Sequence, residues 1–188
     1  MRVIPPTLGE LTVCGLSQAR RHKRAFGAVI TVEDPGARPA QRLRFTRKPA
    51  PAHLVLAFED VDDDTLGIRV AAAEQVADAL AFANKHKDAA LLVHCFHGVG
   101  RSAAIALAIL ADRFGPGAET DAVDRLLALR PEATPNLVVV ALADRLLARN
   151  GALRAAVSKW EASAPHMPQV REARRRLVLD RPELYARL

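Results

Sequence analysis

Residues 90–102 read Ala-Leu-Leu-Val-His-Cys-Phe-His-Gly-Val-Gly-Arg-Ser, and this stretch decides the fold. Its first five residues, of which the first four are apolar, are typical of a buried strand. Residues 103–110 are apolar on every face, which predicts a helix buried in the core. A strand that passes through a glycine-containing loop into a buried helix indicates a domain in which strands and helices alternate.

The rest of the chain continues this alternation. Short runs rich in β-branched residues predict further strands, and apolar residues at helical spacing predict further helices. The expected strands cover residues 10–16, 28–32, 54–58 and 90–94, and the expected helices cover 69–84, 103–110, 120–129 and 136–150, the last capped by Asn136. We therefore expect an α/β domain with a central, mostly parallel sheet flanked by helices on both faces.

A chain of 188 residues that is half hydrophobic can bury one core. We expect one domain over residues 1–161, followed by a basic helical extension over residues 162–188. No run of 18 uncharged apolar residues occurs, and Met1–Pro6 lacks the apolar stretch of a secretory signal. These features predict a soluble, cytoplasmic protein without a membrane partner.

The positive charge of the chain is unevenly distributed. Residues 20–48 carry nine basic and two acidic side chains, so this face is expected to attract anions. Aromatic residues make up 4% of the chain and do not alternate with basic ones, which argues against a nucleic-acid partner. Two cysteines are too few for a disulfide scaffold, so both are expected to be reduced, with Cys14 packed in the core.

The loop between strand and helix combines Cys95, two glycines and Arg101. Gly98 and Gly100 allow positive φ and let successive N–H groups turn inward, and the helix N-terminus adds positive charge. Such a nest suits phosphate or sulfate. The same field favours a cysteine thiolate, and an arginine offers a planar fork that matches two phosphoryl oxygens.

Other loop chemistries fit less well. No lysine follows the second glycine, so the nucleotide-binding Gly-x4-Gly-Lys-Ser/Thr pattern is absent. His94, Cys95 and His97 do not complete a tetrahedral ligand set, so we expect no metal.

The order His94-Cys95-x5-Arg101-Ser102, with glycines at 98 and 100, resembles the signature loop of the protein tyrosine phosphatase superfamily, in its dual-specificity branch. Residues 54–60 resemble the strand that leads into the acid loop of that family, and residues 130–136 resemble the stretch before its next helix. The likeness covers about residues 10–150 and is closest to short prokaryotic members. It implies a cysteine-phosphatase fold that hydrolyses phosphate monoesters without a cofactor.

The resemblance also implies a role for each site residue. Cys95 would attack phosphorus, Arg101 would bind the phosphoryl group, and Asp60 would act as general acid and then as general base. Ser102 would hydrogen-bond the departing thiolate, and His94 would support the loop. Backbone N–H groups would bind the phosphoryl oxygens at Phe96, His97, Gly98, Val99, Gly100 and Arg101.

The choice of the acid is open among neighbours. Five acidic side chains follow the third strand: Glu59, Asp60, Asp62, Asp63 and Asp64. Asp60 follows the strand most directly and matches the acid position of the family, so it is preferred, with Asp62 and Asp63 as alternatives.

The sequence departs from the family in ways that leave the substrate open. The Trp-Pro-Asp acid loop of many tyrosine-specific members is replaced by Phe58-Glu59-Asp60, and the only tyrosine, Tyr185, lies outside the matched region. The loop interior also lacks the lysines of some phosphoinositide-specific members. The expected partner is a phosphorylated protein, carrying phosphotyrosine, phosphoserine or phosphothreonine, or a small phosphorylated molecule.

Two alternative functions come from other classes. A rhodanese-type sulfurtransferase also places a cysteine in a cationic loop after a strand, but it needs no acid on a separate loop. A binding module could capture phosphorylated ligands without turnover. Low-molecular-weight tyrosine phosphatases share the Cys-x5-Arg spacing but place it near the N-terminus, before the acid, which is the opposite order.

Overall fold

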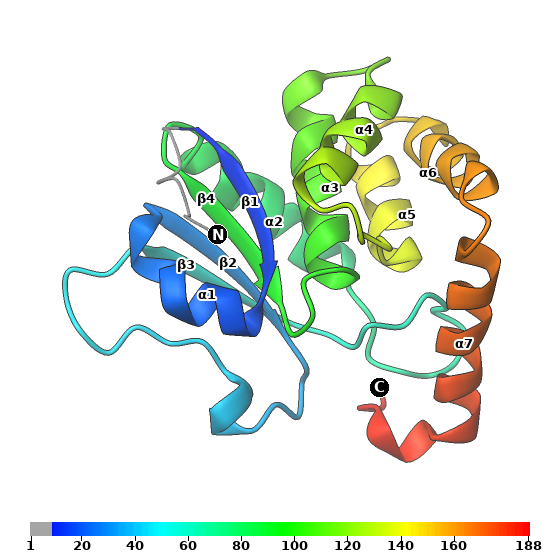
Figure 1. Cartoon of the computed structure of the whole chain (residues 1–188), viewed down its shortest axis with the longest axis horizontal. Coiled ribbons are helices and arrows are strands. Elements are labelled where there is room, and N and C mark those ends of the chain that lie inside the picture. Colours follow the sequence, from blue (N-terminus) through cyan, green and yellow to red (C-terminus); the bar gives the residue numbers. More distant parts are fainter. Residues whose placement is uncertain (1–8) are drawn as a thin grey trace.

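The computed structural model describes residues 9–188, so the expectation for Met1–Pro6 lies outside the described residues. Its centre is a four-stranded, fully parallel sheet (Figure 1). In spatial order the strands are β1 (Leu11–Gly15), β4 (Leu91–Cys95), β2 (Ala28–Glu33) and β3 (Ala52–Ala57). The predicted α/β class and all four predicted strands are confirmed. Because β4 lies between β1 and β2, the loop that follows it leaves from the interior of the sheet.

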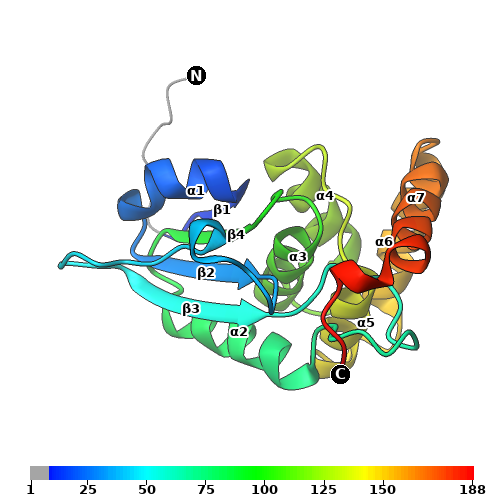
Figure 2. The ribbon, with the colours of Figure 1, turned by 90° about the horizontal axis from the view of Figure 1, so that it is seen from below.

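Seven α-helices accompany the sheet in the described residues (Figures 1 and 2). They are α1 (Leu16–His22), α2 (Ala73–Lys85), α3 (Arg101–Phe114), α4 (Glu119–Leu129), α5 (Leu137–Leu146), α6 (Ala152–Ser163) and α7 (Met167–Asp180). Three single-turn 3-10 helices occupy Lys23–Ala25, Pro39–Gln41 and Pro182–Leu184. Among these helices, none is both long and apolar enough to cross a bilayer.

The two faces of the sheet are covered unequally. Figure 2 shows α1 on one face and α2 on the other. Leu16 and Ala19 of α1 pack with Leu43 over one face, and helices α2 to α6 pack over the opposite one. Every residue of α3 from Arg101 to Ala111 is buried, which confirms the predicted core helix. The first turn of α3 is therefore held rigidly behind the loop.

Some predicted element boundaries were wrong. The helix predicted for residues 136–150 ends at Leu146, because Ala148 and Asn150 adopt positive φ of 53° and 52° and turn the chain into α6. The helix predicted from residue 69 begins at Ala73, because Arg69 instead exchanges backbone hydrogen bonds with neighbouring segments. Neither α1 nor α6 was predicted.

A single carboxylate fixes the join between α5 and α6. Buried Asp144 accepts hydrogen bonds from the backbone N–H groups of Gly151 (2.7 Å), Leu153 (2.9 Å) and Arg154 (3.2 Å). These donors lie at the start of α6, where N–H groups lack partners within the helix. Asp144 therefore sets the direction in which the chain continues toward α7.

We predict that Asp144→Ala lowers the free energy of unfolding by about 2–3 kcal/mol, because three buried or half-buried donors lose a charged acceptor. Asp144→Asn, which keeps one acceptor oxygen, should lose about half as much. Urea unfolding at neutral pH measures both. A loss below about 0.5 kcal/mol for the alanine variant would mean that water replaces the carboxylate at no cost.

Candidate active site

The loop between β4 and α3 folds back onto the sulfur of Cys95. Cys95 is the last residue of β4 and is 2% exposed. Its Sγ accepts hydrogen bonds from the backbone N–H of Gly98 (3.2 Å) and from Oγ of Ser102 (3.1 Å). Both donors would stabilise a negative charge on the sulfur. The structure thus brings Cys95 and Ser102 into direct contact.

The two loop glycines are required for different reasons. Gly98 has φ of 78°, and a Cβ there would lie 2.3 Å from the backbone carbon of Cys14. Gly100 has φ of −98°, so the expected positive φ is wrong at this position. A Cβ on Gly100 would lie 2.1 Å from Oδ2 of Asp60. No larger residue fits at position 100, because the carboxylate of Asp60 occupies the space that a Cβ would need.

Arg101 is a buried cation held by two acceptors. Its Nη1 donates to the carbonyl of Phe58 (2.6 Å) and lies 2.7 Å from Oδ1 of Asp34. Burial by itself would lower the pKa of Arg101, but the negative charges of Asp34, Asp60 and Cys95 raise it above the usual range. Its Nε is buried and has no partner among the described residues. One edge of the guanidinium is therefore fixed, and Nε remains a donor without an acceptor.

Asp60 is oriented by two donors on one of its oxygens. Its Oδ1 accepts from Nδ2 of Asn136 (3.1 Å) and from Nη2 of Arg174 (2.5 Å). Its Oδ2 is the oxygen that lies beside Gly100. Of the five acidic residues after β3, Asp60 is the one whose carboxylate abuts the loop in this way.

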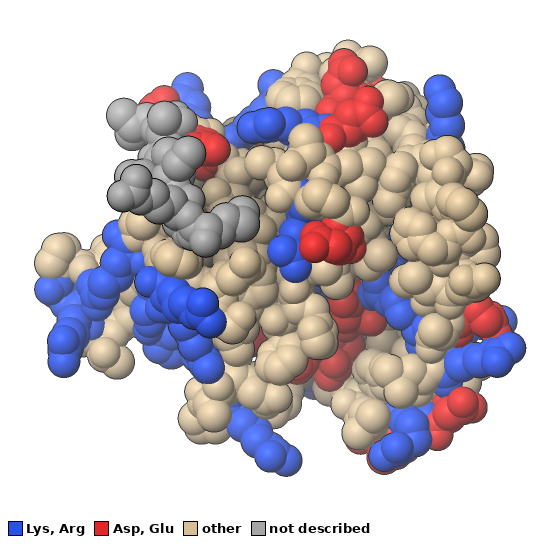
Figure 3. Space-filling view, in the orientation of Figure 1, with Lys and Arg blue, Asp and Glu red and all other residues tan. Residues whose placement is uncertain are grey.

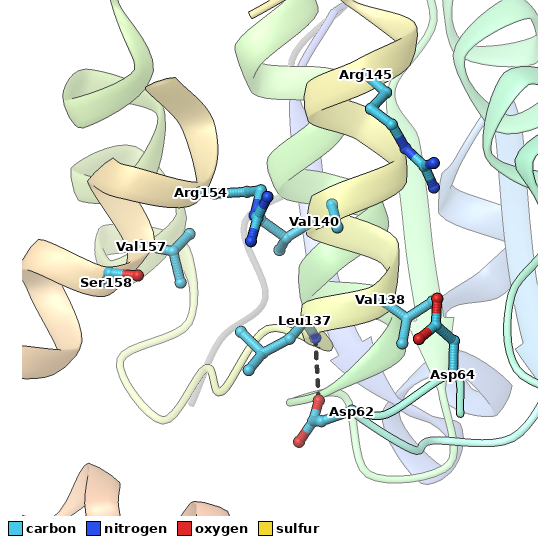
Figure 4. A pocket seen from close by; sticks show the side chains of 10 residues that line it. Asp62, Asp64, Leu137, Val138, Val140, Arg145, Arg154, Val157 and Ser158 are labelled. Atoms are coloured by element: carbon cyan, nitrogen blue, oxygen red, sulfur yellow. Dashed lines mark hydrogen bonds between the residues drawn. The ribbon is translucent and has the colours of Figure 1, made fainter. Parts of the chain in front are cut away.

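The two alternative acids are bound elsewhere. Asp62 accepts from the backbone N–H of Leu137 (3.0 Å) at the start of α5. Figure 4 shows this bond in a hollow of about 320 Å³ between α5 and α6, which Asp64 also lines. Asp63 accepts from the N–H (2.9 Å) and hydroxyl (2.6 Å) of Thr65. Both carboxylates thus accept hydrogen bonds from groups outside the Cys95 loop.

A cleft of about 430 Å³ opens beside the loop. Its lining comes from the loop, the acid loop and the C-terminal segment: Asp34, Glu59, Asp60, His97, Val99, Thr134, Val170, Arg174, Leu177 and Tyr185. Glu59 is buried, which raises its pKa, and the N–H of Ala186 donates to its Oε1. The cleft thus lies on the Asp60 side of the loop.

Several solved structures of phosphatases have a similar fold. The crystal structure of PTPMT1 is 20% identical, with a TM-score of 0.51, over 77% of this chain and 92% of that chain. DUSP15 is 19% identical (TM-score 0.51; 85% and 94% covered), and a mouse putative dual specificity phosphatase is 20% identical (0.53; 83% and 95%). The chain has the fold of the dual-specificity phosphatases. No protein-family model and no curated protein matches the sequence.

Within this dual-specificity phosphatase fold, residues 134–136 support the loop from behind. The N–H of Thr134 donates to the carbonyl of Val99 (2.8 Å), and the N–H of Asn136 donates to that of Gly100 (3.3 Å). The side chain of Asn136 caps α5 by accepting from Val139, as predicted, and also donates to Asp60 and the Val61 carbonyl. One buried amide therefore ties the loop, the acid loop and α5 together.

His94 is tied to β2 beneath the loop. Its Nε2 lies 2.8 Å from Oγ1 of Thr31, which lies 2.7 Å from Nε2 of His53. Its Nδ1 lies 3.4 Å from the Cys95 carbonyl, which can only accept, so we assign the proton to Nδ1. Thr31 then donates to His94 and accepts from His53. Burial lowers the pKa of His94 to about 4, so the ring is neutral at pH 7.

Two other sequence expectations concern the cysteines and metals. Burial raises the pKa of Cys14 to about 12, so this thiol is unreactive at neutral pH and packs in the core as expected. In residues 9–188 no group of three His, Cys, Asp or Glu side chains is arranged to hold a metal ion.

Sequence reasoning missed Asp34, Thr31 and Arg174. Asp34 directly follows β2, and the carboxyl ends of parallel strands lie at one edge of the sheet, so its position could have been flagged. Thr31 lies beside His94 in the strand register, but that register is not visible in the sequence. Arg174 lies 114 residues from Asp60 and carries no local signal.

Basic side chains of residues 20–48 gather on one side of the molecule (Figure 3). Figure 3 shows Lys and Arg gathered over α1 and the segment between β2 and β3. Here Lys23 donates to the carbonyl of Arg44 (2.6 Å), and Arg24 donates to those of Pro49 (2.8 Å) and Arg47 (3.1 Å). The side chains of the 3-10 helix Lys23–Ala25, which follows α1, thus hold residues 34–51 in place.

We predict that stability falls by about 2 kcal/mol between pH 7 and pH 5 because of His94. The unfolded chain binds a proton at this residue near pH 6.5, whereas the folded chain binds it only near pH 4, so acidification favours unfolding. Urea unfolding at pH 7, 6 and 5 measures the slope. His94→Asn should leave only the part of the slope that His53 contributes, because burial lowers the pKa of His53 to about 4 as well. An unchanged slope in this variant would assign the titration to another group.

Proposed function

We propose that this protein hydrolyses phosphate monoesters through a phosphocysteine formed on Cys95. The observation that carries the proposal is the buried Nε of Arg101, which has no acceptor among the described residues and lies at the end of the same loop that surrounds the Cys95 sulfur. A phosphoryl oxygen would supply the missing acceptor. The N–H groups of residues 96–101 and the N-terminus of α3 would bind the remaining oxygens.

The reaction has two displacement steps. The Cys95 thiolate forms an S–P bond as the P–O bond to the leaving group breaks, and the proton of Asp60 passes to the departing oxygen. Water then attacks the phosphocysteine, Asp60 accepts its proton, and the S–P bond breaks to release inorganic phosphate. Ser102 donates to the sulfur that leaves as a thiolate. Neither step calls for a metal or another cofactor.

The assignment of Asp60 as the acid is supported by its orientation. Its Oδ1 is occupied by two donors, and Oδ2 abuts the loop at Gly100. Asp62 and Asp63 are engaged by Leu137 and Thr65. A rhodanese-type sulfurtransferase would leave this oriented carboxylate without a role, and a capture module would not need it.

The substrates that we propose are phosphorylated side chains of proteins or small phosphate monoesters. The cleft beside the loop is about 430 Å³ and is open to both. PTPMT1, whose fold is similar, has been crystallised with PI(5)P, which keeps small phosphorylated molecules among the candidates. A nucleophilic thiol must stay reduced, so we place the protein in the cytoplasm.

The first test is hydrolysis of para-nitrophenyl phosphate between pH 5 and 8 without added metal. Cys95→Ser should reduce activity to the buffer background, because no covalent intermediate forms. Asp60→Asn should lower kcat by about 10²–10⁴ for phenyl phosphate, whose leaving group needs a proton, and by less for para-nitrophenyl phosphate. Asp63→Asn, a matched change on the same loop, should leave kcat within about twofold. Activity that survives Cys95→Ser would overturn the proposal, and transfer of sulfur from thiosulfate to cyanide would favour the sulfurtransferase.

A second test concerns Asp34, which fixes Nη1 of Arg101. We predict that Asp34→Ala weakens inhibition by inorganic phosphate about tenfold, because the guanidinium is no longer held with Nε toward the phosphoryl site. Competition assays at several phosphate concentrations measure the inhibition constant. If Asp34→Ala binds phosphate as tightly as wild type, the Phe58 carbonyl alone orients Arg101.

A further inference from the structure

The C-terminal segment, residues 164–188, is bound along the acid loop. Arg171 pairs with Asp62 (2.9 Å) and Glu161, and Arg174 pairs with Asp60. Beyond α7, the carbonyl of Ala186 accepts from the N–H of Arg69 (2.9 Å). Figure 2 shows this tail lying beside the segment that follows β3. The segment thus encloses the acid loop on the side away from the sheet.

We propose that this segment completes the leaving-group half of the active site: Arg174 is a positioning residue for Asp60, and Val170, Leu177 and Tyr185 form the wall that contacts the leaving group. This inference rests on the proposed phosphatase function. It extends the site beyond residues 10–150, where the resemblance to the phosphatase family lies.

The guanidinium of Arg174 connects the acid to the loop. Its Nη2 donates to Oδ1 (2.5 Å) and to the backbone carbonyl (3.4 Å) of Asp60. Its Nη1 donates to the carbonyl (3.2 Å) and hydroxyl (3.3 Å) of Thr134. The N–H of Thr134 in turn donates to Val99 in the loop (2.8 Å). Arg174 therefore fixes both the rotation of the carboxylate and its distance from the loop.

The rotation of the Asp60 carboxylate matters because only its Oδ2 lies beside the loop. With Oδ1 held by Arg174 and Asn136, the proton to be donated must sit on Oδ2, beside Gly100. A proton donor contributes only when it lies within hydrogen-bond reach of the departing oxygen. Loss of Arg174 removes one of the two donors and leaves the carboxylate free to rotate about the Asn136 contact.

The C-terminal segment contributes Val170, Leu177 and Tyr185 to the lining of the cleft, together with the cationic Arg174. The segments after β2 and β3 contribute the carboxylates Asp34, Glu59 and Asp60. Burial, and then the charges of Glu59 and Asp60, raise the pKa of Tyr185, which agrees with a ring that lies close to both carboxylates. Asp34 and Asp60 are paired with Arg101 and Arg174, so the apolar side chains are the groups left to contact the body of a leaving group. The cleft therefore fits an apolar or aromatic body.

The test compares two substrates within one preparation. Phenyl phosphate releases a basic phenolate that needs a proton, whereas para-nitrophenyl phosphate releases a stable anion. Arg174→Gln should lower kcat for phenyl phosphate at least about tenfold more than for para-nitrophenyl phosphate, because acid catalysis matters most for the poorer leaving group. Arg174→Lys should bring the ratio of kcat for the two substrates part of the way back to its wild-type value. The ratio does not depend on how much of the variant is folded.

Arg176→Gln is the matched control. Arg176 lies on the same helix, is exposed, and pairs with Glu172 (2.7 Å) on the surface. The Arg176→Gln variant should hydrolyse phenyl phosphate and para-nitrophenyl phosphate at the wild-type rates. If Arg174→Gln gives the wild-type ratio, the positioning role is refuted while the phosphatase stands. If wild type hydrolyses neither substrate, the proposed function itself fails.

Tyr185→Ala tests the wall. It should raise KM for naphthyl phosphate about tenfold and leave inhibition by inorganic phosphate unchanged, because phosphate binds in the loop and the naphthyl ring lies in the cleft. Equal weakening of both ligands would show that Tyr185 only supports the fold. An unchanged KM for naphthyl phosphate would show that Tyr185 does not contact the leaving group, and the proposed wall would be wrong.

Discussion

The backbone of the loop passes in direct contact with the end of β1, and the shape of the site depends on this crossing. Gly98 lies so close to Cys14 and Gly15 that a Cβ would come within 2.4 Å of their backbone atoms. The N–H of Leu16 also donates to the carbonyl of Phe96 (3.0 Å). With the loop pinned on this side, the N–H of Gly98 can turn inward to the sulfur of Cys95. An L side chain at Gly98 would lift the loop away from β1.

A buried cation and several carboxylates balance one another around this loop. Arg101 is 4% exposed, and a buried charge is costly unless it is paired. Asp34 and the Phe58 carbonyl meet this requirement at one nitrogen, and Asp60 lies nearby with its own partners, Asn136 and Arg174. The residues that directly follow β2 and β3, the N-cap residue of α5 and one residue of α7 thus converge on one guanidinium and one carboxylate. The site is therefore assembled from segments that lie far apart in the sequence.

The features that could be predicted from the sequence are those formed by residues close together in the chain. The order of residues from His94 to Ser102 predicted the strand, the loop, the core helix and the contact of Ser102 with Cys95. It missed α1, which is seven residues long and begins without a side-chain cap, and it extended α5 past two residues with positive φ. The partners of Arg101 and Asp60 are 67 and 114 residues away in sequence, and only the tertiary fold brings them together. The division into residues 1–161 and 162–188 stays a prediction.

The side chains of Lys23 and Arg24 hold residues 34–51 through carbonyl oxygens, which carry no net charge. The segment is therefore fixed without neutralising the cations, in contrast to an ion pair. Residues 20–48 keep seven net positive charges, whereas the rest of the chain carries eighteen basic and nineteen acidic side chains. The molecule is thus strongly dipolar, and an approaching anion would be drawn toward one end of it. Encounter rates with such ligands should fall as added salt shortens the Debye length.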